Sequence, residues 1–288
     1  MKKKVLVLGS TGMIGHQVHR QLEHSNKYDL HNFSFRKPLN KRSLILDVIN
    51  EQDYFKKIKD LKPDIIINCI GILIEGCNSD LLRAIQINSL LPHKLANLAE
   101  EIDFQLIHMS TDCVFSGRKE EPYVEDDEKD GLDFYAKTKG LGEVVSEKHL
   151  TIRTSVIGPE LKEDGRELFN WFMSQKGEID GYSKGFWSGV SSLELARAVE
   201  WFIDHETKGL YHVTNGKPIS KYDLLCLMKE HTKRKIFINP VSDYRTNKGF
   251  IDSRQEIDFK IPTYDEMIFN MIELIRKEKN LYVHYANL

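Results

Sequence analysis

The sequence has almost no net charge, no long apolar stretch and no cysteine pattern, and each absence excludes a class of function. A formal net charge of −2 over 288 residues argues against non-specific binding to nucleic acid. The most apolar later window, residues 65–74, contains Asn68, Cys69 and Gly71 and cannot span a bilayer. The four cysteines have no metal-type spacing and no accompanying histidine cluster, so we expect no metal site and reduced thiols in a cytoplasmic protein.

We also expect no export signal at the amino-terminus. Basic residues 2–4 are followed by an apolar run of only Val5 to Leu8 before a glycine interrupts it. With 41% hydrophobic and 29% charged residues, the chain has the composition of an ordinary globular protein. Its length suffices for one α/β domain with an appended lobe. We therefore expect no membrane partner and no nucleic-acid partner.

Residues 4–15 organise the rest of the chain. A short apolar strand enters a turn with glycines at positions 9, 12 and 15, and Ile14, Val18 and Leu22 then recur at helical spacing. This spacing is typical of a loop that holds a pyrophosphate at a helix N-terminus, although an ordinary tight turn is the alternative. The residues predicted to contact a dinucleotide here are Gly9, Thr11, Gly12, Met13, Ile14 and Gly15.

The end of the predicted second strand, residues 29–35, indicates which nicotinamide cofactor is bound. Enzymes that prefer NAD tend to place an acidic residue here, whereas an arginine accommodates a 2′-phosphate. This chain offers Arg36 and Lys37 and no acid. We therefore predict NADPH, with NADH as the alternative, and a solvated basic loop as the other interpretation of these residues.

Further candidates follow later strands. Asp47 and Val48 end a short strand, where the carboxylate could accept from an adenine amino group or simply begin the next helix. A buried parallel strand over 64–68 leads into Cys69, Ile70 and Gly71, at the strand end where open α/β sheets bind ligands. Asn88, in a helical pattern over 81–102, could bond a neighbouring backbone carbonyl and hold an active-site water or the lysine, or it could be an ordinary capping or surface residue.

A hydroxyl, a phenol and an ammonium form the candidate catalytic set. Thr111 follows a predicted strand over 104–109, and Tyr135 and Lys139 share one face of a helix that begins at residue 134. Ketone reduction needs a proton donor, for which Tyr135 is suited. Lys139 would lower the tyrosine pKa and Thr111 would orient the carbonyl oxygen. We expect Tyr135 and Lys139 to contact the cofactor as well, since the remaining donors of Lys139 could hold the nicotinamide ribose. The same Tyr-x-x-x-Lys spacing recurs at Tyr244 and Lys248, but without a preceding strand and hydroxyl, so we interpret that copy as a chance match.

Together these features resemble the extended short-chain dehydrogenase/reductases and, within them, the dTDP-4-dehydrorhamnose reductase family. The matching segments are residues 9–15, 47–48, 68–71, Asn88, 110–115, 135–139 with 142–143, 153–155 and 209–212. The resemblance implies a doubly wound parallel Rossmann sheet with a smaller C-terminal substrate-binding lobe. It implies NAD(P)H-dependent reduction of a nucleotide-linked 4-keto-6-deoxy sugar for cell-surface polysaccharide precursors, with Thr111, Tyr135 and Lys139 as catalytic residues. The substrate contacts that it implies are Thr111, Asp112, Trp187 and Ser253.

We expect residues 1–155 to form the NAD(P)-binding domain, completed by elements within 188–214, and residues 156–288 to form mainly the substrate lobe. A homodimer is an open expectation. Two departures from the family pattern fall in that lobe. The family usually has an Arg-Pro pair ahead of a serine; here Ser253 is present, but Lys248-Gly249 stands in place of Arg-Pro. Residues 181–190 also depart from the usual family pattern. The substrate could therefore be a UDP-linked 4-keto-6-deoxy-N-acetylhexosamine.

Three other functions compete with reduction. A sugar-nucleotide dehydratase needs a glutamate base after Thr111-Asp112, where this chain has Cys113. An epimerase could use the same tyrosine and lysine. A non-catalytic NADP-binding regulatory subunit, as occurs among relatives of the family, would not need the complete set of Thr111, Tyr135 and Lys139.

Overall fold

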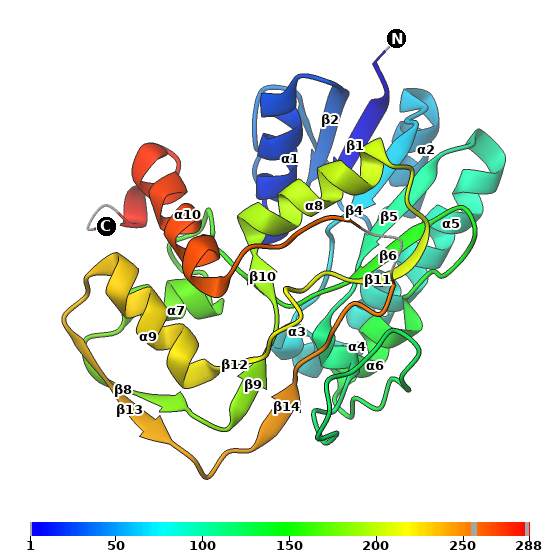
Figure 1. The fold of residues 1–288 in the computed structure, drawn as a ribbon. Coiled ribbons are helices and arrows are strands. Elements are labelled where there is room, and N and C mark those ends of the chain that lie inside the picture. Colours follow the sequence, from blue (N-terminus) through cyan, green and yellow to red (C-terminus); the bar gives the residue numbers. More distant parts are fainter. Residues whose placement is uncertain (1, 255–257, 286–287) are drawn as a thin grey trace.

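A seven-stranded parallel sheet forms the centre of the protein (Figure 1). A computed structural model describes residues 2–254, 258–285 and 288. The strand order is β11-β6-β5-β4-β1-β2-β3, so the chain winds outward in both directions from β1 and β4. The predicted α/β doubly wound fold is confirmed. The strands are β1 (Lys4–Leu8), β2 (Asp29–Ser34), β3 (Ser43–Ile45), β4 (Ile65–Asn68), β5 (Gln105–Met109), β6 (Leu150–Arg153) and β11 (Gly209–His212).

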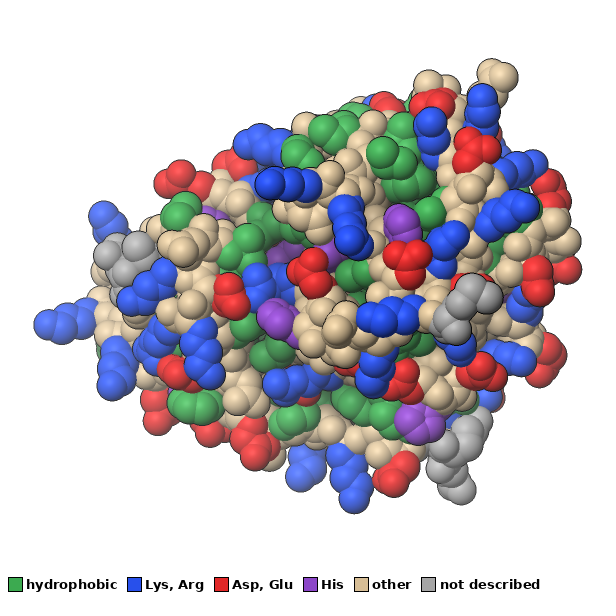
Figure 2. Space-filling view, turned by 90° about the horizontal axis from the view of Figure 1, so that it is seen from above, with side chains coloured by type: hydrophobic (Ala, Val, Ile, Leu, Met, Phe, Trp, Pro, Cys, Tyr) green, Lys and Arg blue, Asp and Glu red, His purple; other side chains and the backbone are tan. Residues whose placement is uncertain are grey.

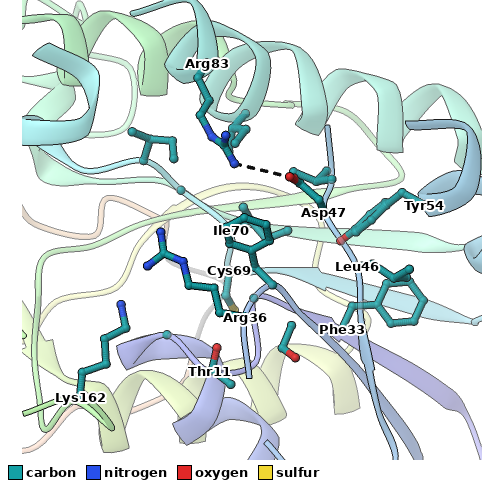
Figure 3. A pocket seen from close by; sticks show the side chains of 18 residues that line it. Thr11, Phe33, Arg36, Leu46, Asp47, Tyr54, Cys69, Ile70, Arg83 and Lys162 are labelled. Atoms are coloured by element: carbon teal, nitrogen blue, oxygen red, sulfur yellow. Dashed lines mark ion pairs between the residues drawn. The ribbon is translucent and has the colours of Figure 1, made fainter. Parts of the chain in front are cut away.

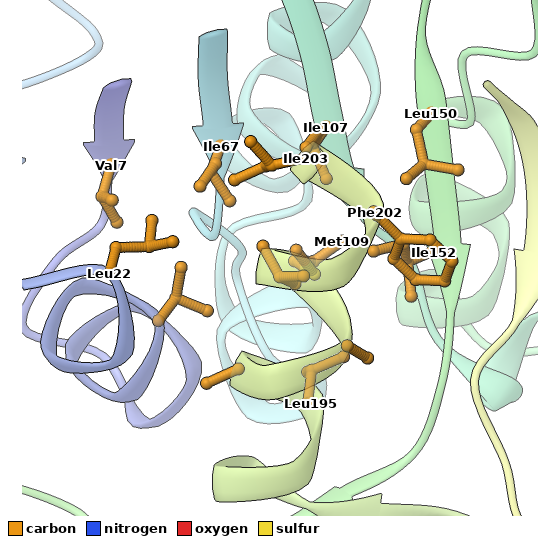
Figure 4. Close-up of a cluster of buried hydrophobic side chains, with 14 of the residues drawn as sticks. Val7, Leu22, Ile67, Ile107, Met109, Leu150, Ile152, Leu195, Phe202 and Ile203 are labelled. Atoms are coloured by element: carbon orange, nitrogen blue, oxygen red, sulfur yellow. The ribbon is translucent and has the colours of Figure 1, made fainter. Parts of the chain in front are cut away.

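Both faces of the sheet are covered by helices, which explains the unbroken apolar runs of its strands. Val5 and Val7 of β1 pack with α1 (Met13–Ser25) and α8 (Ser192–Asp204), whereas Leu6 and Leu8 pack with α2 (Glu51–Leu61) and α5 (Leu91–Ile102). Figure 4 shows the first of these two cores, with strand side chains facing Leu22 of α1 and Phe202 of α8. The sheet and its helical layer extend beyond residue 155, since β11 is one of the strands and α8 packs on one face.

The single helix predicted over 81–102 is instead three consecutive segments. They are α4 (Leu81–Ala84), a π-helical turn η1 (Ile85–Leu90) and α5. Pro92 has no N–H group, so the carbonyl of Asn88 lacks its usual helical partner. The backbone at Gly142 approaches that carbonyl so closely that a Cβ there would lie 1.8 Å from the oxygen. Gly142 therefore lets the end of α6 (Phe134–Leu141) pack against η1.

The smaller lobe lies to the left of the sheet in Figure 1 and has a core of its own. Strand β8 (Gly177–Tyr182) pairs in parallel with β13 (Ile236–Val241), α9 (Lys221–Thr232) packs on both strands, and α10 (Tyr264–Lys277) packs on α9. Ser220 caps α9 by accepting from the N–H of Asp223. The remaining elements are α3 (Ile74–Ser79), η2 (Asp112–Val114), β7 (Val156–Ile157), α7 (Leu168–Ser174), β9 (Gly185–Trp187), β10 (Val190–Ser191), β12 (Ile219–Ser220), β14 (Thr246–Lys248) and η3 (Val283–Tyr285).

The surface is consistent with the near-neutral sequence. On the face shown in Figure 2, basic and acidic side chains are interspersed. Across the described part of the chain, no helix combines the length and apolar character needed to cross a bilayer.

Candidate active site

The glycine loop after β1 leaves room for a ligand's phosphates. Gly9 has φ +75°, which favours glycine, and its N–H donates to the carbonyl of Phe33 (3.0 Å). A Cβ on Gly15 would lie 2.2 Å from the oxygen of Gly9, so only glycine permits this packing of α1 against the loop. Helix α1 starts at Met13 without an acidic residue or a side-chain cap in its first turn. Its first backbone N–H groups are therefore available to an anion, and the residues present fit a dinucleotide pyrophosphate.

A cavity of about 580 Å³ lies at the carboxyl ends of β1, β2 and β4, where the doubly wound sheet reverses its order. Figure 3 shows its lining. Nine predicted cofactor residues line it, namely Gly9, Thr11, Gly12, Arg36, Asp47, Val48, Cys69, Ile70 and Gly71. The other predicted cofactor residues lie outside this lining, namely Met13, Ile14, Gly15, Lys37, Asn88, Tyr135 and Lys139.

Asn88 does not line the cavity but holds the backbone of a residue that does. Its side chain is fully buried, accepts from the N–H of Ile72 (2.8 Å) and donates to the carbonyl of the same residue (2.9 Å). Its amide also donates to the Thr138 hydroxyl (3.1 Å). Because Ile72 lines the cavity, Asn88 fixes the loop after β4 and holds it against α6.

Two cations at the rim were not predicted from the sequence. Arg83, from α4, lies 3.7 Å from Asp47, and its guanidinium is 5.6 Å from the ring centroid of Phe35. Lys162, from the segment between β7 and α7, lines the cavity opposite α4 (Figure 3). No motif marks either residue, so the sequence carried no signal for them.

The predicted catalytic set is brought together at the carboxyl end of β5. The Thr111 hydroxyl, which donates to Asp112 (3.1 Å), lies close enough to the Tyr135 phenol to affect its pKa, and Lys139 follows one helical turn after Tyr135. Thr111 also accepts from the N–H of Cys113 (3.1 Å), so it serves as the cap of η2 as well. Lys139 is buried and donates to the carbonyl of Met109, the last residue of β5 (2.6 Å).

Burial shifts the acid–base properties of this set. Burial raises the pKa of the Tyr135 phenol, which is opposed by the hydrogen bond from Thr111. Burial lowers the pKa of Lys139 to about 8, although the carboxylate of Glu143 favours its charged form. Tyr135 is therefore protonated at neutral pH and can donate a proton, and Lys139 is mostly charged there.

A buried ion pair lies directly behind the catalytic strand. Glu143 accepts from Nε (2.7 Å) and Nη2 (2.8 Å) of Arg153, from the Ser110 hydroxyl (2.7 Å), and pairs with Lys129 at 3.1 Å. These groups hold the pKa of Glu143 below its usual value, against the effect of burial. The carboxylate of Glu143 thus places a fixed negative charge beside Ser110, the residue before Thr111, and near Lys139.

A second cavity, of about 560 Å³, lies between the catalytic strand end and the smaller lobe. Asp112 and Cys113 line it from the sheet side. Five aromatic and two basic side chains line it from the lobe: Trp171, Tyr182, Phe186, Trp187, Tyr244, Lys221 and Lys248. The ammonium of Lys221 lies 5.5 Å from the ring centroid of Trp187.

The lobe residues that line the second cavity differ from those expected from the sequence. Ser253 does not line the second cavity; its hydroxyl and N–H donate to Glu125, whose other oxygen accepts from the N–H of His212 (2.9 Å). Conversely, Tyr244 and Lys248, which we interpreted as a chance match, are not on a helix but both line this cavity.

Comparison with known proteins gives a consistent result. The family description "RmlD substrate binding domain" matches residues 2–249. Spore coat polysaccharide biosynthesis protein SpsK of Bacillus subtilis is 28% identical, with 80% of this chain and 79% of that protein covered. The dTDP-4-dehydrorhamnose reductase of Shigella flexneri is 25% identical (80% and 78% covered), and the methionine adenosyltransferase 2 subunit beta of Mus musculus is 26% identical (79% and 72%).

Among solved structures, the dTDP-4-dehydrorhamnose reductase of Bacillus anthracis in complex with NADP superposes with a TM-score of 0.83. It covers 95% of this chain and 100% of that one at 22% identity. At this identity the likeness concerns the fold alone.

Proposed function

This chain belongs to the RmlD substrate-binding-domain family, and from that premise we propose that it is an NADPH-dependent 4-ketoreductase of nucleotide-linked 4-keto-6-deoxy sugars. The observation that carries the proposal is that the Thr111 hydroxyl lies near the Tyr135 phenol, with Lys139 one helical turn further along α6. The first cavity is suited to a dinucleotide, and the second, lined by Asp112 and Cys113 next to Thr111, opens to the lobe.

The first cavity fits a nicotinamide cofactor in shape and charge. The glycine loop and the start of α1 would hold the pyrophosphate, and the backbone at Cys69 to Gly71 would border the dinucleotide. The solved reductase with NADP and the Arg36 side chain in the lining both support NADPH over NADH. When bound, this cofactor supplies the hydride.

The side chains at the end of β5 would manage the proton and the developing charge. Tyr135 donates its phenolic proton to the ketone oxygen, and Thr111 orients that oxygen with a second hydrogen bond. The ammonium of Lys139 stabilises the phenolate left behind, since an opposite charge favours the ionised form. The hydrogen bond from Lys139 to the carbonyl of Met109 fixes the ammonium at the end of β5.

The second cavity is suited to the nucleotide diphosphate part of the substrate. Its aromatic side chains offer stacking surfaces for a base, and Lys221 and Lys248 supply positive charge for a diphosphate. Residues 1–155 with α8 and β11 would then bind the cofactor and the rest of 156–288 the sugar nucleotide. The Lys248-Gly249 departure lies in this wall, so a UDP-linked N-acetylhexosamine remains an alternative to a dTDP-linked substrate.

The test is NADPH oxidation with a panel of dTDP-, UDP- and GDP-linked 4-keto-6-deoxy sugars, with Tyr135→Phe as the matched control. We expect one sugar nucleotide to be reduced with one NADPH consumed per product, and the variant to be inactive. Sugar conversion without net NADPH loss would indicate an epimerase or dehydratase instead. Tight NADPH binding with no turnover on any member of the panel would indicate a regulatory subunit.

A further inference from the structure

The adenosine end of the proposed cofactor site opens into a second hollow of about 760 Å³, outside the first cavity. Four residues line both spaces: Thr11, Phe35, Arg36 and Lys162. This junction therefore combines a hydroxyl, an aromatic ring and two cations, and it contains no carboxylate. The acids of the outer hollow, Glu163 and Asp164, do not line the inner cavity.

We propose that Lys162 is a specificity-determining residue that binds the 2′-phosphate of the cofactor together with Arg36. The inference rests on the proposed function, since it presumes that the first cavity takes a nicotinamide dinucleotide. Arg36 follows β2 and Lys162 precedes α7, so the two cations reach the junction from segments far apart in the chain (Figure 3). A ribose phosphate would thus be contacted from two directions.

The two cations are available for a ligand. Within the described residues, neither Arg36 nor Lys162 forms a hydrogen bond or ion pair with protein, and the Arg36 guanidinium lies 5.3 Å from the ring centroid of Phe35. Arg83, by contrast, already has Asp47 as a partner. A phosphate that carries nearly two negative charges would therefore be a strong partner for Arg36 and Lys162 together.

The backbone that carries Lys162 is held in place by its neighbours. The N–H of Glu160 donates to the Tyr285 hydroxyl (3.2 Å), and the N–H of Glu167 donates to the carboxylate of Glu160 (3.0 Å). The side-chain amide of Asn170 donates to the carbonyl of Glu163 (3.1 Å). The segment is thereby tied to η3 and to the lobe on both sides of Lys162, which limits the entropy lost when the lysine binds a phosphate.

The test compares two probes that differ only in the 2′-phosphate, adenosine 2′,5′-bisphosphate and 5′-AMP, by isothermal titration calorimetry without sugar substrate. Lys162→Met should weaken the bisphosphate about tenfold or more and leave 5′-AMP unchanged, as loss of a charge-assisted hydrogen bond requires. Lys41→Met is the matched control, since Lys41 is an exposed cation of the same basic loop that lines neither space. It should leave both affinities unchanged.

Equal bisphosphate affinity in wild type and Lys162→Met would overturn the proposal, as would an equal loss for both probes. The assay also separates this inference from the reductase function. If the wild-type protein binds the two probes equally, the proposed 2′-phosphate site is wrong. Turnover with NADH would in that case still support the proposed reductase function.

Discussion

Replacing Glu143 with glutamine tests the buried charge behind the catalytic strand. The Glu143 and Arg153 side chains are 1% and 4% exposed and form a bidentate pair, with Ser110 and Lys129 as further partners. Removing one partner of such a buried pair leaves the other charge uncompensated. We therefore expect Glu143→Gln to lower the free energy of unfolding by about 3–5 kcal/mol.

The pH dependence of that loss has a defined sign. The partners of Glu143 depress its pKa below the ordinary value of 4.5, so its stabilising contribution is present above pH 4.5 and is lost as the pH falls through the folded-state pKa. The difference between wild type and variant should therefore be full at pH 7 and shrink in acid. Urea denaturation at several pH values measures it.

Two comparisons make this prediction refutable. Glu51→Gln is the matched control, because Glu51 pairs with Lys94 at the surface, where the side chains are 48% and 39% exposed, and it should cost less than about 1 kcal/mol. Glu143→Gln should also shift the alkaline limb of the pH–rate profile to lower pH, since Glu143 favours charged Lys139. If Glu143→Gln is no less stable than Glu51→Gln, or if the alkaline limb of the pH–rate profile does not move, the role assigned to the Glu143 carboxylate is wrong.

Three further predictions concern the site itself. Tyr135→Phe should keep its NADPH dissociation constant, measured by fluorescence titration, and lose about 10²–10⁴-fold in kcat; near-wild-type turnover would remove the acid role from Tyr135. In wild type, kcat/KM for reduction should fall as the pH rises through about 8, because Lys139 loses its charge there, and a profile flat to pH 10 would contradict that role. Gly15→Ala should abolish dinucleotide binding in calorimetry, because its Cβ would meet the Gly9 oxygen at 2.2 Å, whereas Gly140→Ala, with its nearest neighbour at 3.6 Å, should bind normally. Equal binding by the two glycine variants would show that the loop is not closely packed.

The sequence was sufficient where function depends on local spacing. Periodicity of 2 or 3.6 residues shows where a strand or helix begins and ends. It therefore predicts the glycine turn, the strand-end positions 47–48 and 69–71, and the helical pair of Tyr135 and Lys139. The order of the strands then brings them together at one edge of the sheet, as the doubly wound fold requires.

What could not be predicted depends on contacts between distant segments. Lys162 reaches the cofactor cavity only because its segment crosses from the sheet to the lobe, and no motif marks it. Asn88 holds Ile72 because η1 packs against α6, a contact that follows from the absent N–H of Pro92 and the bare backbone of Gly142. Lys221 and Tyr244 face the second cavity through pairings within the lobe, which have no local signature.

Hydride transfer to the sugar tests the central claim most directly. The protein would be incubated with NADPH deuterated at the transferable position of its nicotinamide and with the accepted 4-keto-6-deoxy sugar nucleotide, and the product analysed by mass spectrometry and NMR. The account predicts one deuterium per product, on carbon 4 of the sugar, with one NADPH consumed. Product formed without deuterium at carbon 4, or without loss of NADPH, would contradict it.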